Sequence, residues 1–380
     1  MLIPRRYWLD LIERAWGKKS VLWMSGVRRA GKTFLCKSLP DVYYFDCELP
    51  RTRRLIEDPE QFLESWRGKK LVLDEIHRLP NPSELLKIAA DHFPSTKIMA
   101  TGSSTLGASA KFRDTLTGRK VEIWLTPMNS IDLLDFGQPD LQRRLHRGGL
   151  PQFFLASDYP ERDFQEWMDA YWAKDIQELF RLERRHAFAR FAELLFAQSG
   201  GIFEATGFSR PCGVSRTTIA NYLAVLEATF VVHIVRPFSA RRATEIVAAP
   251  KVYGFDTGFV CHYKGWETLR PEDKGLLWEH YVLNEIQARL QRRNVQTWRD
   301  KQHHEIDFIL EKGPSKVIAI ECKWAADQFD PANLKVFRRL HSAGLNFVVA
   351  SDVDQGFRRD YQGLQVEFVG LDSLIAALSR

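Results

Sequence analysis

The chain has 380 residues, 45% of them hydrophobic, which excludes a single small domain and predicts two or three folded domains. Lysine and arginine exceed aspartate and glutamate by 54 to 48, a formal charge of +6 that is compatible with an anionic partner but too small to identify one. The 5 cysteines lack metal-like or disulfide-like spacing, and no apolar run approaches membrane-spanning length, so we expect a cytoplasmic protein with no membrane partner.

A glycine-rich loop is the first informative motif along the chain. Residues 5–16 predict a short amphipathic helix, and the apolar run at residues 21–24 predicts a buried strand. Residues 26–33 then have the spacing G-x-x-x-x-G-K-T, which is that of a phosphate-binding P-loop. This motif requires a strand before it and a helix after it, and residues 33–37 are compatible with the helix.

The chemistry of this loop predicts ATP and Mg²⁺ as cofactors. Backbone N–H groups and the helix N-terminus face an anion, while Lys32 reaches the β- and γ-phosphates and Thr33 offers its hydroxyl to Mg²⁺. Arg28 and Arg29 have no further assigned role, so contact with solvent, a neighbouring subunit or DNA remains open for both. The predicted nucleotide-binding residues are Gly26, Val27, Arg28, Arg29, Ala30, Gly31, Lys32, Thr33 and Phe34.

Three further strands are predicted at residues 42–46, 71–75 and 97–101. The apolar strand at 71–75 ends in Asp74 and Glu75, which is the Walker B pattern. We expect Asp74 to hold Mg²⁺, through water or through Thr33, and Glu75 to polarise the attacking water. Because ligands bind at the carboxyl ends of parallel strands, both side chains are expected at the same edge as the P-loop.

Two more catalytic residues follow these strands. Ser103 comes directly after the strand at 97–101 and is the predicted γ-phosphate sensor, with Thr101 and Ser104 as its competitors. Arg119 precedes an apolar strand at 121–125 and is the candidate for an arginine finger that reaches the nucleotide of a neighbouring subunit. A surface ion pair is the alternative role for Arg119.

A winged helix is predicted after an irregular stretch at 125–158 and long helices at 160–200. Ser215 is suited to cap a helix whose apolar side chains share one face, and strands at 230–235 and 251–255 follow it. A recognition helix in the major groove and a basic wing on the phosphates would bind DNA. The predicted DNA-binding residues are Arg216, Thr217 and Asn221 on the helix and Arg241 and Arg242 at the wing tip.

Pro211 is unusual for the helix before this recognition helix. Proline is accepted in the first turn of a helix, so we expect the helix around Pro211 to start late or to be broken. Contact with a protein or a subunit instead of DNA remains an alternative function of the winged helix.

The last third of the chain contains a possible nuclease site. Asp307 lies in a predicted strand, and a hairpin brings it close to Glu321 and Lys323, which alternation places on one strand face. Two carboxylates for Mg²⁺ and a lysine for water make the D…E-x-K pattern of restriction-endonuclease-like enzymes. Glu279 on a preceding helix is the further metal ligand, with Glu285 as its rival. Retention of this fold for binding DNA or a partner is the alternative.

The motifs together resemble a known family over nearly the whole chain. The matching segments are SGVRRAGKT, LVLDEIHRLP, ATGSST, LTGR, GGLPQ, PKVYGFDTGF, LLWEHYVLNEI and EIDFILEKGPSKVIAIECKW. The chain resembles bacterial and archaeal AAA+-type ATPases whose P-loop domain is followed by a DUF4143 region, and its last part resembles the archaeal Holliday-junction resolvase branch of the endonuclease fold. The resemblance implies an AAA+ helicase-like or switch-like core and supports Arg119 as a finger.

The predicted fold class is α/β with three domains. They are an AAA+/ASCE-type P-loop NTPase sheet at residues 1–150, a helical linker and winged helix at 151–256, and a PD-(D/E)xK nuclease-like domain at 257–380. The predicted function is a Mg²⁺-dependent ATPase, acting as a homo-oligomer such as a hexamer, that couples ATP hydrolysis to binding or remodelling branched or forked DNA. Two alternatives remain open: a nucleotide-dependent switch with a protein partner in defence or signalling, and a DNA nuclease licensed by ATP.

Overall fold

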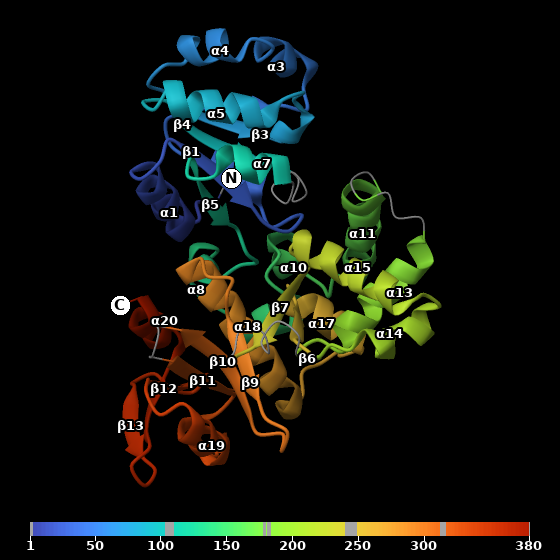
Figure 1. Ribbon diagram of the computed structural model, residues 1–380, viewed down its shortest axis with the longest axis vertical. Helices are drawn as coiled ribbons and strands as arrows, with labels where there is room; N and C mark the ends of the chain where they lie inside the picture. Colours follow the sequence, from blue (N-terminus) through green and yellow to red (C-terminus); the bar gives the residue numbers. More distant parts are fainter. Residues whose placement is uncertain are drawn as a thin grey trace. The chain divides into compact units, whose positions relative to one another are not determined.

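The computed structural model describes residues 3–102, 110–177, 180, 184–239, 249–311 and 317–379. The chain forms two compact units, whose elements are labelled in Figure 1. The first contains Met1–Asp140, Leu150–Glu183 and Ala228–Val231, and the second contains Leu141–Gly149, Arg184–Glu227 and Val232–Arg380. The domain boundaries that the sequence suggested at residues 150 and 256 stay predictions.

A five-stranded sheet forms the core of the first unit. Its strand order is β2-β3-β4-β1-β5 and all of its pairings are parallel, so the P-loop NTPase sheet predicted from the sequence is confirmed. The carboxyl ends of β1, β3 and β4 therefore lie at one edge, where ligands bind in such sheets. The strands are β1 (Val21–Ser25), β2 (Val42–Asp46), β3 (Lys70–Asp74), β4 (Lys97–Thr101) and β5 (Lys120–Trp124).

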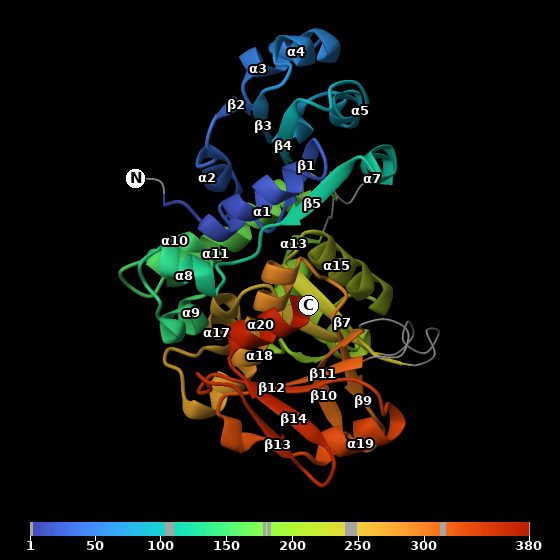
Figure 2. The ribbon, with the colours of Figure 1, turned by 90° about the vertical axis from the view of Figure 1, so that its left-hand side faces the viewer.

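Helices cover both faces of this sheet, as right-handed crossovers between parallel strands require. Figure 2 shows α2 on one side of the sheet and α5 and α7 on the other. On the side of α5 and α7, the rings of Trp23 and Phe112 pack with their centroids 4.8 Å apart in a buried cluster that includes Leu73. The helices are α1 (Arg6–Trp16), α2 (Lys32–Lys37), α3 (Pro50–Leu55), α4 (Pro59–Ser65), η1 (Ile76–Arg78), α5 (Pro82–His92) and α7 (Ala110–Leu116).

A buried ion pair connects the P-loop to the helices that complete the first unit. Arg5 is 4% exposed and donates to both oxygens of the fully buried Asp132, at 2.9 Å and 2.6 Å. The Nη1 atom of Arg5 also donates to the carbonyl oxygen of Ala30, inside the P-loop, at 3.0 Å. The completing helices are α8 (Ser130–Asp135), α10 (Pro151–Leu155), α11 (Glu161–Tyr171) and the π-helix η2 (Trp172–Gln177).

The second unit contains a winged helix. Its helices and strands alternate as helix, strand, helix, helix, strand, strand, and β8 pairs antiparallel with both β6 and β7. The Ser215 hydroxyl accepts the N–H of Thr218 at 3.1 Å at the start of α15, so the predicted cap is present. The elements are α13 (Arg185–Ala197), β6 (Gly201–Ile202), α14 (Ala205–Cys212), α15 (Arg216–Ala228), β7 (Val232–Pro237) and β8 (Lys251–Gly254).

The expectation for Pro211 is wrong. Pro211 lies inside α14, one residue before its end, and the helix neither starts late nor is broken there. A proline costs helix stability through its missing N–H and the clash of its ring with the carbonyl four residues earlier. Here both effects act on the carbonyl of Gly207, and the helix nevertheless continues through Pro211. It ends at the next residue, Cys212, after which Gly213, with φ +64°, turns the chain away.

A nine-stranded mixed sheet joins the winged helix to the rest of the second unit. Its order is β13-β14-β12-β11-β10-β9-β7-β8-β6, and β7 pairs with β9 in parallel. The predicted α/β character of this region is therefore present. Helix α18 contacts β11 and α20 contacts β12, while α19 contacts β10.

The remaining elements of the second unit complete this sheet and its helices. They are α9 (Leu141–Arg147), α17 (Thr257–Lys264), α18 (Pro271–Leu290), β9 (Gln296–Arg299), β10 (Glu305–Glu311), β11 (Val317–Lys323), η3 (Ala326–Gln328), α19 (Ala332–Leu340), β12 (Asn346–Ala350), β13 (Phe357–Asp360), β14 (Gln365–Val369) and α20 (Leu371–Ser379). Throughout the ranges that the structure describes, every helix is too short or too polar to cross a membrane.

Replacing Arg5 by methionine is expected to destabilise the first unit by about 3 kcal/mol, because Asp132 would remain buried without its cation. Urea unfolding measures this change. The matched control is Arg67→Met, because Arg67 and Glu64 form an ion pair whose side chains are 55% and 60% exposed. The control should leave the unfolding midpoint unchanged, and an equally small effect of Arg5→Met would contradict the importance of the buried pair.

Candidate nucleotide site and a second acidic cluster

The P-loop follows β1 and curls because two of its glycines adopt backbone conformations that other residues avoid. Gly26 has φ +144°, and a Cβ atom there would lie 2.3 Å from the carbonyl oxygen of Leu125. Gly31 has φ +99° and is the residue before α2, so the loop turns directly into the helix N-terminus. A side chain at position 26 would therefore clash with Leu125, and a side chain at position 31 would strain the backbone because of its positive φ.

Lys32 lies over the loop it belongs to. Its Nζ atom donates to the carbonyl oxygens of Gly26 at 2.8 Å and Val27 at 3.1 Å. Burial lowers the pKa of Lys32, while the negative charges of Glu75 and Asp175 oppose this effect. The lysine is thus held at the mouth of the loop, where an anion would replace the two carbonyl contacts.

Asp74 at the end of β3 receives hydrogen bonds from three elements. The Thr33 hydroxyl on α2 donates to its Oδ2 atom at 2.8 Å, and the Tyr44 hydroxyl on β2 donates to the same atom at 2.5 Å. The Thr101 hydroxyl on β4 donates to its Oδ1 atom. The structure therefore brings Thr33 and Asp74 together, as the sequence predicted, and adds Tyr44 and Thr101 to the site.

Glu75 has a strained backbone and a paired carboxylate. It has φ +55°, unusual for a residue other than glycine, and its N–H donates to the Thr101 hydroxyl at 3.2 Å. Its Oε2 atom lies 3.1 Å from Nδ1 of His77. Burial would raise the pKa of Glu75, but the hydrogen bond and charge of His77 and the charges of Lys32 and Arg28 together lower it. Glu75 is therefore ionised, and its carboxylate is engaged with His77.

A cavity of about 750 Å³ in the first unit contains these groups. Gly31, Lys32, Thr33 and Glu75 line it together with Phe34, whose side chain is 69% exposed. The Nη1 atom of Arg29, another lining residue, is buried and has no hydrogen-bond partner among the described residues. An unpaired guanidinium nitrogen beside a P-loop is suited to an anionic ligand.

The P-loop is also fixed by the π-helix η2, which the sequence did not reveal. Nε of Arg28 lies 2.6 Å from Oδ2 of Asp175, and Nε1 of Trp167 on α11 donates to the Arg28 carbonyl oxygen at 3.2 Å. π-Helical turns are rare and occur often at functional sites. Lys174 and Asp175 of this turn line the same cavity, so η2 belongs to the candidate nucleotide site.

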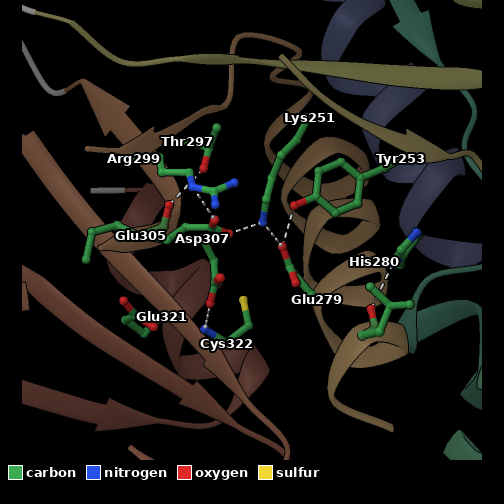
Figure 3. Close-up of polar contacts among 12 residues, drawn as sticks. Lys251, Tyr253, Glu279, His280, Thr297, Arg299, Glu305, Asp307, Glu321 and Cys322 are labelled. Atoms are coloured by element: carbon green, nitrogen blue, oxygen red, sulfur yellow. Dashed lines mark hydrogen bonds and ion pairs between the residues drawn. The ribbon is translucent and has the colours of Figure 1, made fainter. Parts of the chain in front are cut away.

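A second cluster of charged residues lies in the nine-stranded sheet (Figure 3). Asp307 on β10 accepts the N–H of Cys322 at 2.7 Å and lies 3.8 Å from Nζ of Lys323. Lys323 in turn donates to Oε2 of Glu321 at 2.7 Å. The hairpin of β10 and β11 thus brings together Asp307, Glu321 and Lys323, as the sequence predicted.

Glu279 on α18 is held by residues that the sequence analysis missed. Its Oε1 atom lies 3.2 Å from Nζ of Lys251 and accepts a hydrogen bond from the Tyr253 hydroxyl, and both of these residues belong to β8. Its rival Glu285 is fully buried and lies 3.8 Å from Arg289 of the same helix. Lys251 and Tyr253 lie in the segment PKVYGFDTGF that shares in the family resemblance, but this segment gave neither residue a role, and Lys251 lies 28 residues before Glu279.

Burial and mutual repulsion perturb these carboxyl groups. Burial raises the pKa of Glu279 to about 7, and the negative charge of Asp307 adds to the shift. The same two causes raise the pKa of Glu321 to about 8, although Lys323 opposes them. Within the described residues, no three His, Cys, Asp or Glu side chains are grouped so that they could hold a metal ion.

Three family models match successive parts of the chain. Residues 18–134 match an AAA domain, residues 138–270 a domain of unknown function (DUF8612), and residues 274–367 a domain of unknown function (DUF4143). The chain therefore combines an AAA domain with a C-terminal DUF4143 domain. This confirms the resemblance of the motifs to AAA+-type proteins with a DUF4143 region, and the five-stranded parallel sheet of the first unit is the core of the AAA domain.

The curated relatives share most of this chain. An uncharacterized protein of Mycobacterium tuberculosis is 28% identical over 324 residues, which is 82% of this chain and 72% of that protein. An uncharacterized protein of Methanocaldococcus jannaschii is 21% identical over 380 residues, which is 88% of this chain and 82% of that protein.

Two solved structures are among those similar to this chain. The Walker-type ATPase of Pyrococcus abyssi is 15% identical, with a TM-score of 0.43, over 69% of this chain and 96% of that one. Cdc6p from Pyrobaculum aerophilum is 11% identical, with a TM-score of 0.26, over 74% of this chain and 96% of that one.

The remaining predicted residues of the AAA domain stay predictions. Arg119 forms an ion pair with Asp91, with Nε and Oδ1 2.7 Å apart, which is the contact expected from its alternative role. Ser103, the predicted sensor, and Ser104 lie outside the described residues. Their competitor Thr101 is fully buried and binds Asp74 and Glu75.

The winged helix between the AAA and DUF4143 domains exposes its predicted recognition face. Arg216, Thr217 and Asn221 on α15 are exposed, whereas Ile219 and Tyr222 are buried against the unit. The other two predicted DNA-binding residues, Arg241 and Arg242, lie outside the described residues.

Replacing the acidic or the basic partner of the Arg28–Asp175 pair should change ATP affinity in opposite directions. Asp175→Asn removes a negative charge beside the triphosphate site and should tighten ATP binding about threefold or more, while Arg28→Met leaves Asp175 uncompensated and should weaken it similarly. The double variant should return close to the wild-type affinity, because the pair is neutral in sum. Titration with a fluorescent ATP analogue measures all three.

Glu166→Gln is the control for this cycle, since Glu166 is an exposed residue of α11 that does not line the cavity. It should leave the affinity unchanged. Equal loss of affinity in both single variants, with no recovery in the double variant, would show that the pair acts through folding rather than through charge.

Proposed function

We propose that the chain is a Mg²⁺-dependent ATPase that acts on DNA, with branched or forked DNA as its target, and that it couples ATP hydrolysis to binding or remodelling this DNA. The observation that carries the proposal is the hydrogen bond between Thr33 and Asp74 beside Lys32 and Glu75 in one cavity. Binding a triphosphate, holding its metal and activating water are the three tasks of such a site, and each has a residue here.

The residues fit ATP and Mg²⁺ in the following way. Lys32 exchanges its contacts with the Gly26 and Val27 carbonyls for phosphate oxygens, and the N-terminus of α2 faces the same anion. Thr33 and Asp74, 2.8 Å apart, would hold Mg²⁺ directly and through water. When bound, Mg²⁺ would neutralise negative charge on the phosphate oxygens. Glu75 orients the attacking water when it leaves His77.

DNA is the proposed partner because of the exposed face of α15. Arg216, Thr217 and Asn221 are available to bases and phosphates, while the opposite face of the helix is buried. Arg241 and Arg242 are proposed to contact the phosphates from the wing. The net charge of +6 agrees in sign with a polyanionic partner.

A homo-oligomer, for example a hexamer, is the proposed working form. In it, Arg119 would leave Asp91 and stabilise the charge that develops on the nucleotide of the neighbouring subunit. Ser103 is proposed to sense the γ-phosphate. The proposed domains are the ATPase domain at 1–150, the linker and winged helix at 151–256 and the nuclease-like domain at 257–380.

A nucleotide-dependent switch with a protein partner is the second candidate function. The contact between Glu75 and His77 favours it, because a carboxylate engaged at 3.1 Å is not free to activate water and turnover would be slow. A switch retains its nucleotide, whereas a DNA-dependent motor accelerates hydrolysis when DNA binds.

The two candidates are separated by the ATPase rate measured with duplex, forked and four-way-junction DNA. The proposed function predicts at least a tenfold increase with one of these DNAs, and Glu75→Gln should abolish hydrolysis while retaining ATP binding. Arg216→Ala combined with Asn221→Ala should remove the DNA stimulation and keep the basal rate. If the protein does not bind any of these DNAs and its ATPase rate does not change when they are added, the proposed function is contradicted and the switch remains.

A further inference from the structure

The DUF4143 domain carries Glu279, Asp307 and Glu321, the acidic residues that the sequence predicts as ligands of a divalent cation. Mg²⁺ demands a near-octahedral set of oxygen ligands and retains several water molecules. A Mg²⁺ site therefore needs carboxylate oxygens that converge on one position and space beside them for water molecules. The contacts of Glu279, Asp307 and Glu321 decide the fit.

The helix carboxylate already has a cation. Lys251 from β8 places its Nζ atom 3.2 Å from Oε1 of Glu279 and in contact with Oε1 of Glu305 on β10 (Figure 3). The ammonium thus joins α18 to β10 by contacting one carboxylate on the helix and one on the strand. Lys251 is 7% exposed, so its charge is directed into the cluster and not to solvent.

The Tyr253 hydroxyl occupies the same oxygen of Glu279. Tyr253 is fully buried and follows Lys251 by two residues on β8, so alternation along the strand directs both side chains to the same face. An ammonium and a phenol hydrogen therefore both satisfy Oε1 of Glu279. Fixed donors of this kind hold the carboxylate in a protein-only network.

The strand carboxylates are engaged as well. Oδ2 of Asp307 accepts the Cys322 N–H at 2.7 Å, and Oε2 of Glu321 accepts from Lys323 at 2.7 Å. The other oxygen of Glu321 is buried and has no hydrogen-bond partner among the described residues. Among the same residues, no three His, Cys, Asp or Glu side chains are grouped so that their ligand atoms could surround one cation. The residues present therefore do not fit Mg²⁺ in this arrangement.

We propose that the Lys251 ammonium is the resident cation of the acidic cluster and replaces the divalent metal that the nuclease-like fold implies. The cluster then links β8 of the winged helix to α18 and β10 through salt bridges. The DUF4143 domain of this chain is accordingly a structural module without metal-dependent cleavage. This inference does not depend on the proposed ATPase activity, because it concerns a separate set of residues.

Mn²⁺ binding, followed by electron paramagnetic resonance without nucleotide, tests the proposal. All proteins carry Asp74→Asn, so that the AAA domain contributes no Mn²⁺ site. The Asp74→Asn protein itself should show no site with Kd below 1 mM, while Lys251→Met should bind one Mn²⁺ at least tenfold more tightly, because Glu279 and Glu305 lose their ammonium. Adding Asp307→Asn and Glu279→Gln should remove the new site.

Lys264→Met is the matched control, since Lys264 ends α17 of the same unit and has no contact with Glu279, Glu305, Asp307 or Glu321. It should gain no Mn²⁺ site. Lys251→Gln serves as a second variant if Lys251→Met fails to fold. A Mn²⁺ site in the Asp74→Asn protein that Asp307→Asn abolishes would overturn the proposal, and so would the absence of any gain in both Lys251 variants.

Discussion

The arrangement of the nucleotide site depends on the carboxylate of Asp74. It receives hydroxyl hydrogen bonds from Thr33 on α2, Tyr44 on β2 and Thr101 on β4, so one side chain joins the P-loop helix to both strands beside β3. Asp74 is 3% exposed, and a buried carboxylate is tolerated only when donors surround it. The hydrogen bonds that satisfy this charge are therefore also the contacts that fix the geometry of the site.

The sequence predicted the parts of this site that are set by local spacing. The P-loop and the Asp74–Glu75 pair lie within short motifs whose backbone conformation is determined by glycines and by the strand end, and the parallel sheet follows from the succession of strands and helices. Tyr44, Asp175 and Lys251 were missed because each reaches its partner through the fold, across 30, 147 and 28 residues of chain. Pro211 was misjudged because the rule for proline in helices states a free-energy cost and not a prohibition, and burial of Phe208 and Cys212 on the same helix can offset that cost.

The two charged clusters show how different surroundings give the same side chain different roles. Lys32 contacts carbonyl oxygens, which a phosphate can displace, and it lines a cavity of about 750 Å³. Lys251 contacts two carboxylates and is 7% exposed, so removing it would leave buried negative charge without compensation. A lysine in the first setting is suited to ligand exchange, and a lysine in the second setting is suited to permanent structure.

The position of Lys251 also explains why the winged helix and the DUF4143 sheet are parts of one compact unit. Backbone pairing of β7 with β9 makes the sheet continuous, and the contacts of Lys251 and Tyr253 with Glu279 add side-chain links from β8 to α18. A chain divided at residue 256 would separate Glu279 from both of these partners and expose the edge of β9. Because an unpaired edge and an uncompensated buried charge are both unfavourable, the hairpin of β7 and β8 is needed by the DUF4143 sheet as well as by the winged helix.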